Sequence, residues 1–184
     1  LMFASLSKNP QFLRDFCSRL VVHVLTTFKP ERTLKILDHM AGEIRPEMKR
    51  HINRWRWDWK LTRLFMTTDD WEQNLDQLRE FCIKRPRIML SILDRQFGVG
   101  KTLATSINVT TQGQGHVFAE NIPLDDGRLE GPVPASLDIV VSVKPAPGYV
   151  FKGWANHPKE GPQIRVKAGQ TFKDSALFET IDTH

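Results

Sequence analysis

Apolar positions in the first hundred residues recur every three or four residues, which is the spacing of an amphipathic helix. Asn9-Pro10 pairs a favourable N-cap with a favourable first helical residue. After it, four apolar side chains follow one another at intervals of four: Phe12, Phe16, Leu20 and Val24. The pattern predicts a helix that begins at Pro10 and continues to about Phe28, with one apolar face.

Three more prolines, Pro30, Pro46 and Pro86, precede further helical periodicity, and each predicts the start of another helix. Thr67, with Asp70 three residues later, resembles a capping box and predicts one more helix start. Gly98 follows the last periodic segment and predicts a left-handed C-cap. Residues 1–98 are therefore expected to form a compact all-α unit of five helices.

After Lys101 the hydrophobic period changes to two, which indicates half-buried strands. The inward positions include Ile107, Val109, Val117, Leu137, Ile139, Val141 and Val143. Pro147-Gly148 fits the central positions of a type II turn. We expect roughly six short strands in a small β-sandwich or curled sheet over residues 104–184, after a linker at 99–103. The fold class is α+β in two modules, which we expect to fold independently with modest mutual contact.

The charge of the chain is divided unevenly between these modules. There are 18 Lys+Arg against 12 Asp+Glu up to residue 98, and 8 against 9 after it. A basic surplus can attract nucleic acid, anionic lipid or an acidic protein, but interspersed acidic residues favour solvated helix faces. Cys17 and Cys82 lie in apolar helical patterns and are interpreted as small buried residues. No apolar run approaches the ~20 residues of a membrane helix.

Tryptophans alternate with basic residues between Arg45 and Arg63, a mixture that also occurs on surfaces that stack nucleic-acid bases. In a helix, Trp55 and Trp59 share the face of Met48 and Ile52, so we favour a core role for them. The alternative is an anion or ligand surface, whose candidate residues are Arg50, Arg54, Arg56, Trp57, Lys60 and, in the second module, Trp154.

Motifs for catalysis or metal binding are not evident. Gly98-Val99-Gly100-Lys101-Thr102 ends like a phosphate-binding loop, but Arg95 replaces the first glycine and a helix precedes it, so we interpret it as a hinge. The six histidines have no ligand-like spacing, and no GxSxG motif is present. Asp69-Asp70 and Asp125-Asp126 fit a helix start and a turn. We predict no catalytic, cofactor or metal residue here.

An ordered set of short motifs in the first module resembles the C-terminal helical end of the CotH family, the spore-coat kinase-like proteins. The motifs are Leu6–Phe16, Thr26–Phe28, Pro30–Arg32, Ile36–Asp38, Glu43–Glu47, Arg54-Trp55, Leu78–Phe81 and Arg85-Pro86. The resemblance implies an atypical kinase-like fold that uses ATP and Mg²⁺, with its nucleotide- and metal-binding residues upstream of Leu1. Lys29 stands where a Ser or Thr cap is expected before Pro30.

The second module is similar to bacterial surface repeats related to the internalin B-repeat. The similarity lies in Pro147–Trp154 and in the closing Ala176–Glu179. This resemblance implies a β-grasp or sandwich spacer on an exported protein, and hence an extracellular or cell-envelope location.

Three functions follow as hypotheses. The first is a non-catalytic C-terminal fragment of an exported CotH-like bacterial protein, whose partners are other proteins or its own upstream kinase-like domain. The second is an adhesion or carbohydrate-binding module in which Tyr149, Phe151 and Trp154 stack on a cell-surface glycan. The third, and least favoured, is nucleic-acid binding by residues 45–63.

Overall fold

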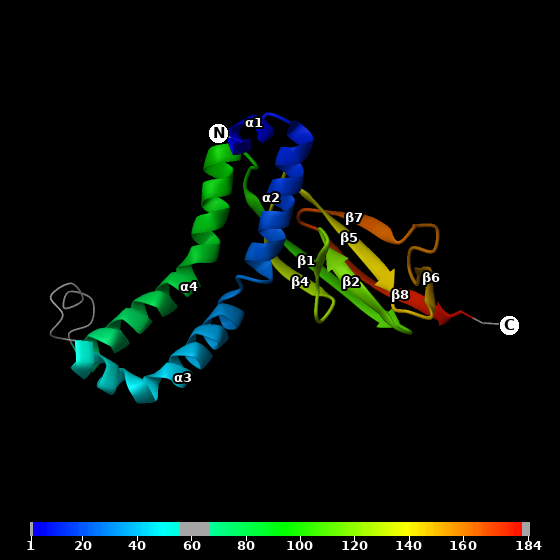
Figure 1. Cartoon of the computed structure of the whole chain (residues 1–184). Coiled ribbons are helices and arrows are strands. Elements are labelled where there is room, and N and C mark those ends of the chain that lie inside the picture. The colour runs from blue at the N-terminus through cyan, green and yellow to red at the C-terminus, as the bar shows by residue number, and fades with distance from the viewer. Residues whose placement is uncertain (1, 56–66, 182–184) are drawn as a thin grey trace. The chain divides into compact units, whose positions relative to one another are not determined.

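The computed structural model describes residues 2–55 and 67–181, with helices in the first half of the chain and strands in the second (Figure 1). This arrangement confirms the α+β class. The helices are α1 (Met2–Leu6), α2 (Pro10–Leu25), α3 (Pro30–Trp55) and α4 (Thr68–Phe97).

Helix α2 begins where the sequence predicts. Asn9 Oδ1 accepts hydrogen bonds from the backbone N–H groups of Gln11 at 2.9 Å and Phe12 at 3.2 Å, and Pro10 occupies the first turn. The predicted apolar stripe of α2 is only partly right, because Phe12, Phe16 and Leu20 stay half-buried. The fully buried face lies beside this stripe and consists of Cys17, Ser18, Val21, Val22 and Val24.

Pro46 and Pro86 were predicted to start helices, but this prediction is wrong. They lie inside α3 and α4. An internal proline removes one backbone hydrogen bond and crowds the preceding turn. In α3, Leu37 and Ala41 precede Pro46 while Met48 and Ile52 follow it, and all four belong to one apolar cluster with Trp71 and Leu75 of α4. Packing on both sides of the proline outweighs its local cost.

The ends of α4 match their predicted caps. Thr67 N–H donates to Asp70 Oδ2 at 2.9 Å and Asp70 N–H donates to Thr67 Oγ1 at 3.1 Å, which is a reciprocal capping box. At the other end Gly98 has φ +61° and its N–H donates to Asp94 O at 2.8 Å.

The predicted hinge at 99–103 is not a free linker. Val99 is buried, and its carbonyl oxygen accepts from Ser136 N–H at 3.2 Å and from Ser136 Oγ at 2.7 Å. Lys101 O accepts from Ala135 N–H at 2.9 Å, and strand β1 already begins at Thr102. These bonds tie the segment to the strands that follow it.

Eight strands form two four-stranded sheets, in the orders β4-β1-β8-β6 and β3-β2-β5-β7. Their bounds are β1 (Thr102–Gln112), β2 (Gly115–Ala119), β3 (Ile122–Pro123), β4 (Arg128–Pro134), β5 (Asp138–Pro145), β6 (Tyr149–Trp154), β7 (Gln163–Lys167) and β8 (Thr171–Thr180). The predicted turn at Pro147-Gly148 is confirmed, with Gly148 at φ +83° and Tyr149 N–H donating to Ala146 O at 3.0 Å.

Strand β4 contains Gly131, Pro132 and Pro134, which are residue types more typical of turns than of strands. They fit here because β4 is an edge strand, where a missing N–H need not interrupt a ladder. Gly131 also lets α2 approach closely, since a Cβ atom there would lie 2.5 Å from Leu25 Cδ2.

One hydrophobic core joins α2, the end of α4 and both sheets. Helix α2 contacts β4 and β3, which are edge strands of the two sheets, so its valine face closes this side of the sandwich. The chain accordingly divides into two compact units, residues 1–27 with 89–184, and residues 28–88. The predicted boundary near residue 98 is thus a change of secondary structure and not the boundary between compact units.

We expect Val21→Ala on α2 to weaken the β-sandwich as well as the helix. Val21 is fully buried, and removing two buried methyl groups costs about 2 kcal/mol of unfolding free energy. Hydrogen exchange measured by mass spectrometry should show faster exchange of β1 and β4 amides. Val150→Ala on β6, where Val150 is exposed, is the matched control and should change little. Faster exchange confined to α2 would contradict a shared core.

Candidate functional site

The predicted anion surface is only partly within the described residues. Arg50 and Arg54 are exposed on the last turns of α3, where Arg50 Nη1 lies 3.9 Å from Glu47 Oε2 and Arg54 stacks 5.2 Å from the Trp55 ring. Arg56, Trp57, Trp59 and Lys60 lie outside the described residues. The surface stays a prediction.

The predicted core role of Trp55 is wrong, because its side chain is 42% exposed. The core of this helix pair is formed by Ala41 and Ile52 of α3 and by Trp71 and Leu75 of α4, and Trp55 is not part of it.

Trp154, the predicted sugar-stacking residue, is 1% exposed. Its Nε1 donates to Gly161 O at 2.7 Å, and its ring packs edge-on against Phe151 at 5.8 Å and Phe172 at 6.1 Å. A buried ring offers no face to a sugar, so the glycan-binding role of Trp154 is wrong. A register shift between Phe151 and Gly153 changes the strand alternation and leaves Trp154 inside.

The loop-like segment after α4 does not fit a nucleotide phosphate. A phosphate loop presents free backbone N–H groups to its ligand. Here Gly98 N–H donates to Asp94 O and Gly100 N–H donates to Asp94 Oδ1, both at 2.8 Å. These donors are already used, which agrees with the missing glycine at Arg95.

A buried carboxylate that the sequence analysis missed organises the loop between β6 and β7. Asp174 Oδ1 accepts from the backbone N–H groups of Asn156 at 3.0 Å and Ser175 at 2.7 Å, while Oδ2 lies 2.6 Å from His157 Nδ1. Burial alone would raise the pKa of Asp174, but the hydrogen bonds from His157 and the two amides lower it below its usual value.

The ionised Asp174 can only accept hydrogen bonds, so His157 Nδ1 must carry the proton. The imidazole lies tilted against Phe172, 5.5 Å between centroids, with about half of the side chain exposed. A carboxylate beside an imidazole fixes which ring nitrogen carries the proton. This arrangement occurs at catalytic histidines and also at structural ones. Since Asp174 also bonds two loop amides, we interpret the pair as a clamp on the loop.

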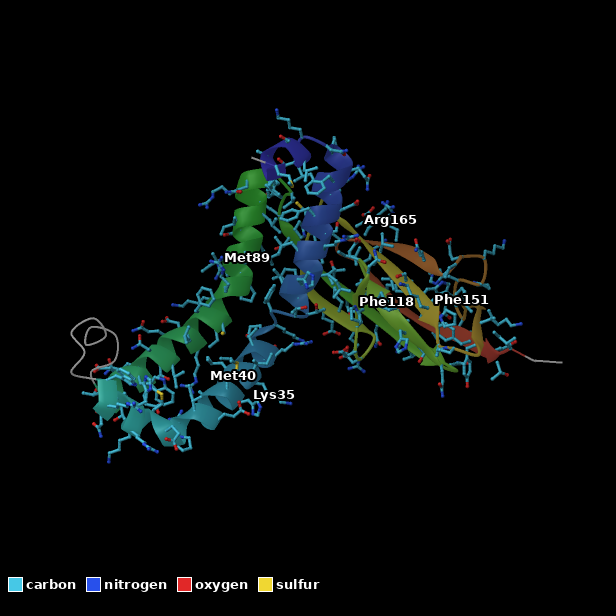
Figure 2. All side chains as sticks on the ribbon, in the orientation of Figure 1. Lys35, Met40, Met89, Phe118, Phe151 and Arg165 are labelled. Carbon is cyan, nitrogen blue, oxygen red and sulfur yellow. The ribbon has the colours of Figure 1, made fainter. Side chains whose placement is uncertain are left out.

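A small polar cavity of about 160 Å³ lies where α2 meets the β-sandwich. Its lining includes Gln11, Arg14, Asp15, Ser18, Glu120, Asp138 and Arg165, the last of which is labelled in Figure 2. Val140 N–H donates to Glu120 Oε1 at 2.7 Å, and Ser18 Oγ donates to Asp138 O at 3.3 Å. Burial raises the pKa of Glu120; the Val140 bond opposes this rise and Asp15 adds to it. Several of the polar lining groups therefore already bond to protein.

Glu120 and Asn121 have φ +50° and +64° in the two-residue turn between β2 and β3. Positive φ at both positions is what a type I′ hairpin turn requires. In the sequence, Asn121 is the residue of this pair that indicates a turn, because a glutamate such as Glu120 is not typical there.

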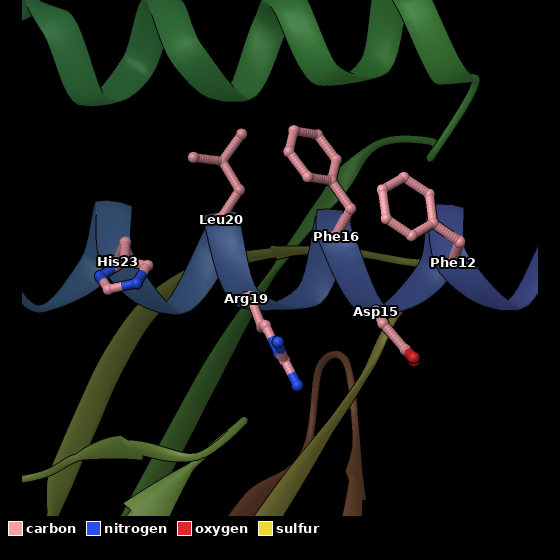
Figure 3. Close-up of a pocket in the computed structure, with 6 residues that line it drawn as sticks. All are labelled: Phe12, Asp15, Phe16, Arg19, Leu20 and His23. Atoms are coloured by element: carbon pink, nitrogen blue, oxygen red, sulfur yellow. The ribbon is translucent and has the colours of Figure 1, made fainter. Parts of the chain in front are cut away.

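A groove of about 340 Å³ runs along α2 and shows how the helix separates its side chains. Phe12, Phe16 and Leu20 point to one side and Asp15 and Arg19 to the other (Figure 3). Phe16 contacts Phe3 at 5.1 Å and Phe97 at 6.1 Å, measured between ring centroids. The half-buried stripe of α2 thus belongs to an aromatic cluster.

Within residues 2–55 and 67–181, no group of three or more His, Cys, Asp or Glu side chains is placed to hold a metal ion. Cys17 is buried, as predicted, and burial raises the pKa of its thiol. Cys82 is half-buried.

Comparison with known proteins gives one similarity. The model of the family described as CotH kinase protein matches residues 1–89, which span α1 to α3 and most of α4. Neither the curated proteins nor the solved structures contain a significant match to the chain. The match shows that residues 1–89 are similar to CotH kinase proteins, while the B-repeat resemblance of residues 104–184 stays a prediction.

We expect Asp174→Asn to destabilise the sandwich by about 1–3 kcal/mol at neutral pH, because an amide cannot accept all three hydrogen bonds. Since folding lowers the pKa of Asp174, its contribution is complete above the ordinary Asp pKa of about 3.9 and declines as the pH falls toward the folded value. The difference in unfolding free energy between the wild type and Asp174→Asn, measured by urea unfolding, should therefore become smaller as the pH is lowered.

Glu179→Gln is the matched control on the same strand, since Glu179 forms only an exposed pair with Lys152 at 3.0 Å. It should change stability little. A gap for Asp174→Asn that stays constant from neutral to acidic pH would contradict the clamp.

Proposed function

We propose that residues 1–89 are the C-terminal helical part of a CotH-like domain, and that this chain supplies structure and an interaction surface in place of catalytic residues. The family match carries the proposal, and the order of the motifs from Leu6 to Pro86 supports it. ATP and Mg²⁺ would then belong to the remainder of that domain.

The unit of residues 28–88 has a small core and a large apolar surface. Four apolar residues are buried within it: Ala41, Ile52, Trp71 and Leu75. Exposed large apolar side chains outnumber them and are Phe28, Ile36, Met40, Ile44, Trp55, Leu78, Phe81, Ile83 and Ile88. A core this small stabilises a helix pair weakly, and apolar patches of this kind mark interaction surfaces.

Ile36, Met40 and Ile44 follow each other at intervals of four along α3, which places them in one row. Figure 2 labels Met40, which is 59% exposed. On the facing helix Phe81 is 55% exposed. We call the row Ile36–Met40–Ile44 the α3 row, and propose that it packs against the upstream kinase-like part of the same protein.

Polar contacts hold the two helices in register without covering the α3 row. Arg79 of α4 donates to Asp38 of α3 at 2.8 Å, and Arg45 of α3 pairs with Glu72 of α4. Within α4, Arg79 also donates to Asp76 at 2.6 Å. The helix pair therefore offers a defined surface to a partner.

We also propose that the protein is exported and acts at the cell surface, with residues 104–184 as a spacer. The surface-repeat resemblance and the coat association of CotH proteins support this location. Among the described residues, no helix is both long and apolar enough to cross a membrane.

The α3 row can be tested with Met40→Glu and Ile44→Glu. If the row packs against the upstream part, copurification of the separately expressed upstream part with this chain should fall at least about tenfold, because each burial of such a side chain contributes roughly 1.5–3 kcal/mol. His39→Gln and Glu43→Gln alter exposed neighbours and should leave copurification unchanged.

Sedimentation of this chain alone distinguishes self-association. A dimer that both Glu variants dissociate would assign the α3 row to a second copy and contradict the proposal. An open reading frame without a kinase-like part upstream of Leu1 would do the same.

Calorimetric titration of this chain with ATP and Mg²⁺ should give no binding heat, since the proposal places the nucleotide site elsewhere. GDP with Mg²⁺ controls for nonspecific heats. Saturable micromolar binding of ATP would contradict the non-catalytic role and would require a site among these residues.

A further inference from the structure

The first and last strands of the β-sandwich lie side by side and run in the same direction. β1 pairs with β8 in parallel over seven residues, from Ser106 opposite Thr171 to Gln112 opposite Leu177. Both are central strands, with β4 on the outer side of β1 and β6 on the outer side of β8.

Parallel pairing places the two chain ends of the sandwich at opposite ends of this sheet. The chain enters β1 at Thr102 and leaves β8 at Thr180, so the entry and exit points are separated along the strand direction (Figure 1). An antiparallel pair of terminal strands would bring entry and exit to the same end.

We propose that the sandwich is a tension-bearing module whose mechanical clamp is the β1–β8 ladder. Force applied between its two ends acts along the strands, so the ladder bonds are loaded together in shear. In the antiparallel case the same force would open the bonds one after another. This proposal does not depend on the CotH-like assignment of the helices.

The ladder is protected from water on its inner side. Ile107 and Val109 of β1, and Phe172, Asp174 and Ala176 of β8, are buried. Water therefore has little access to the ladder bonds from this face.

The far end of the clamp is closed by backbone contact. A Cβ atom at Gly113, just after β1, would lie 2.3 Å from Phe178 O of β8, so only glycine allows this approach. At the near end, Ser106 N–H donates to Gln170 O at 3.1 Å.

The outer strands discourage lateral pairing with other chains. β4 carries Pro132 and Pro134 and is contacted by α2, and β6 has its register shift beside Lys152. The sheet is thus suited to load along the chain and less suited to strand addition.

The test pulls single molecules of the full chain in two directions. An azide-bearing residue at Lys101 or at Gln114, both exposed, gives one attachment point, and the C-terminus gives the other. Lys101 loads β1 and β8 in shear. Gln114 follows β1 at the end where β8 leaves, so the same bonds are opened in sequence.

At equal loading rates, the rupture force from Lys101 should exceed that from Gln114 several-fold. Equal forces in the two directions would overturn the proposal. Both attachment points lie outside the paired residues of β1 and β8. The comparison therefore does not depend on whether a substituted ladder still folds.

Two proline variants identify the bonds that carry load. Along β1, Ser106 N–H points toward β8, whereas Val109 N–H donates to Gly127 O on the opposite side. Because successive N–H groups of a strand point to alternate sides, Thr110 N–H points toward β8 and Thr111 N–H points away from it. Thr110→Pro should lower the Lys101 rupture force toward the Gln114 value. Thr111→Pro, the matched control, should not. Equal losses in two folded variants would contradict a β1–β8 clamp.

Discussion

The burial of α2's valine face against the edges of the sandwich is the contact on which the rest of the structure depends. Two open sheets leave their edge strands β4 and β3 uncovered, and α2 fills this side with Val21, Val22 and Val24. Apolar side chains from residues 17–24 and from residues beyond 99 thereby share one core. The short connection at 99–101 is ordered by the same packing, because Val99 is drawn into that core.

This contact also explains why the helical segment does not form one unit. Helix α2 and the end of α4 belong to the unit of the sandwich, while α3 and the first part of α4 form the second unit. Their four-residue core leaves the α3 row and Phe81 exposed. The division falls inside α4 between residues 88 and 89, close to Pro86, where the helix lacks one backbone hydrogen bond.

Buried polar chemistry in the sandwich serves architecture. Asp174 faces inward on β8, where an isolated carboxylate would be costly, and three donors compensate for its desolvation. Together with the Trp154 bond to Gly161, it holds the loop between β6 and β7 at both ends. A loop that is hydrogen-bonded at both ends and a parallel terminal ladder both fit the load-bearing role proposed for the sandwich.

The sequence alone determined the local features, because caps and turns depend on a few neighbouring residues. Asn9-Pro10, the Thr67–Asp70 box, Gly98 and Pro147-Gly148 were all predicted correctly, as was the change of period that separates helices from strands. These signals identify where elements begin and end, and they sufficed for the α+β class.

Only the tertiary structure decided which faces are buried and which elements share a core. Pro46 reads as a helix start until packing on both sides of it is known, and a one-residue register shift turns Trp154 from a surface candidate into a core residue. The pairing of Asp174 with His157 joins residues 17 positions apart, and α2 meets β4 across about a hundred. The physical reason is that burial depends on contacts between distant segments, which no local pattern encodes.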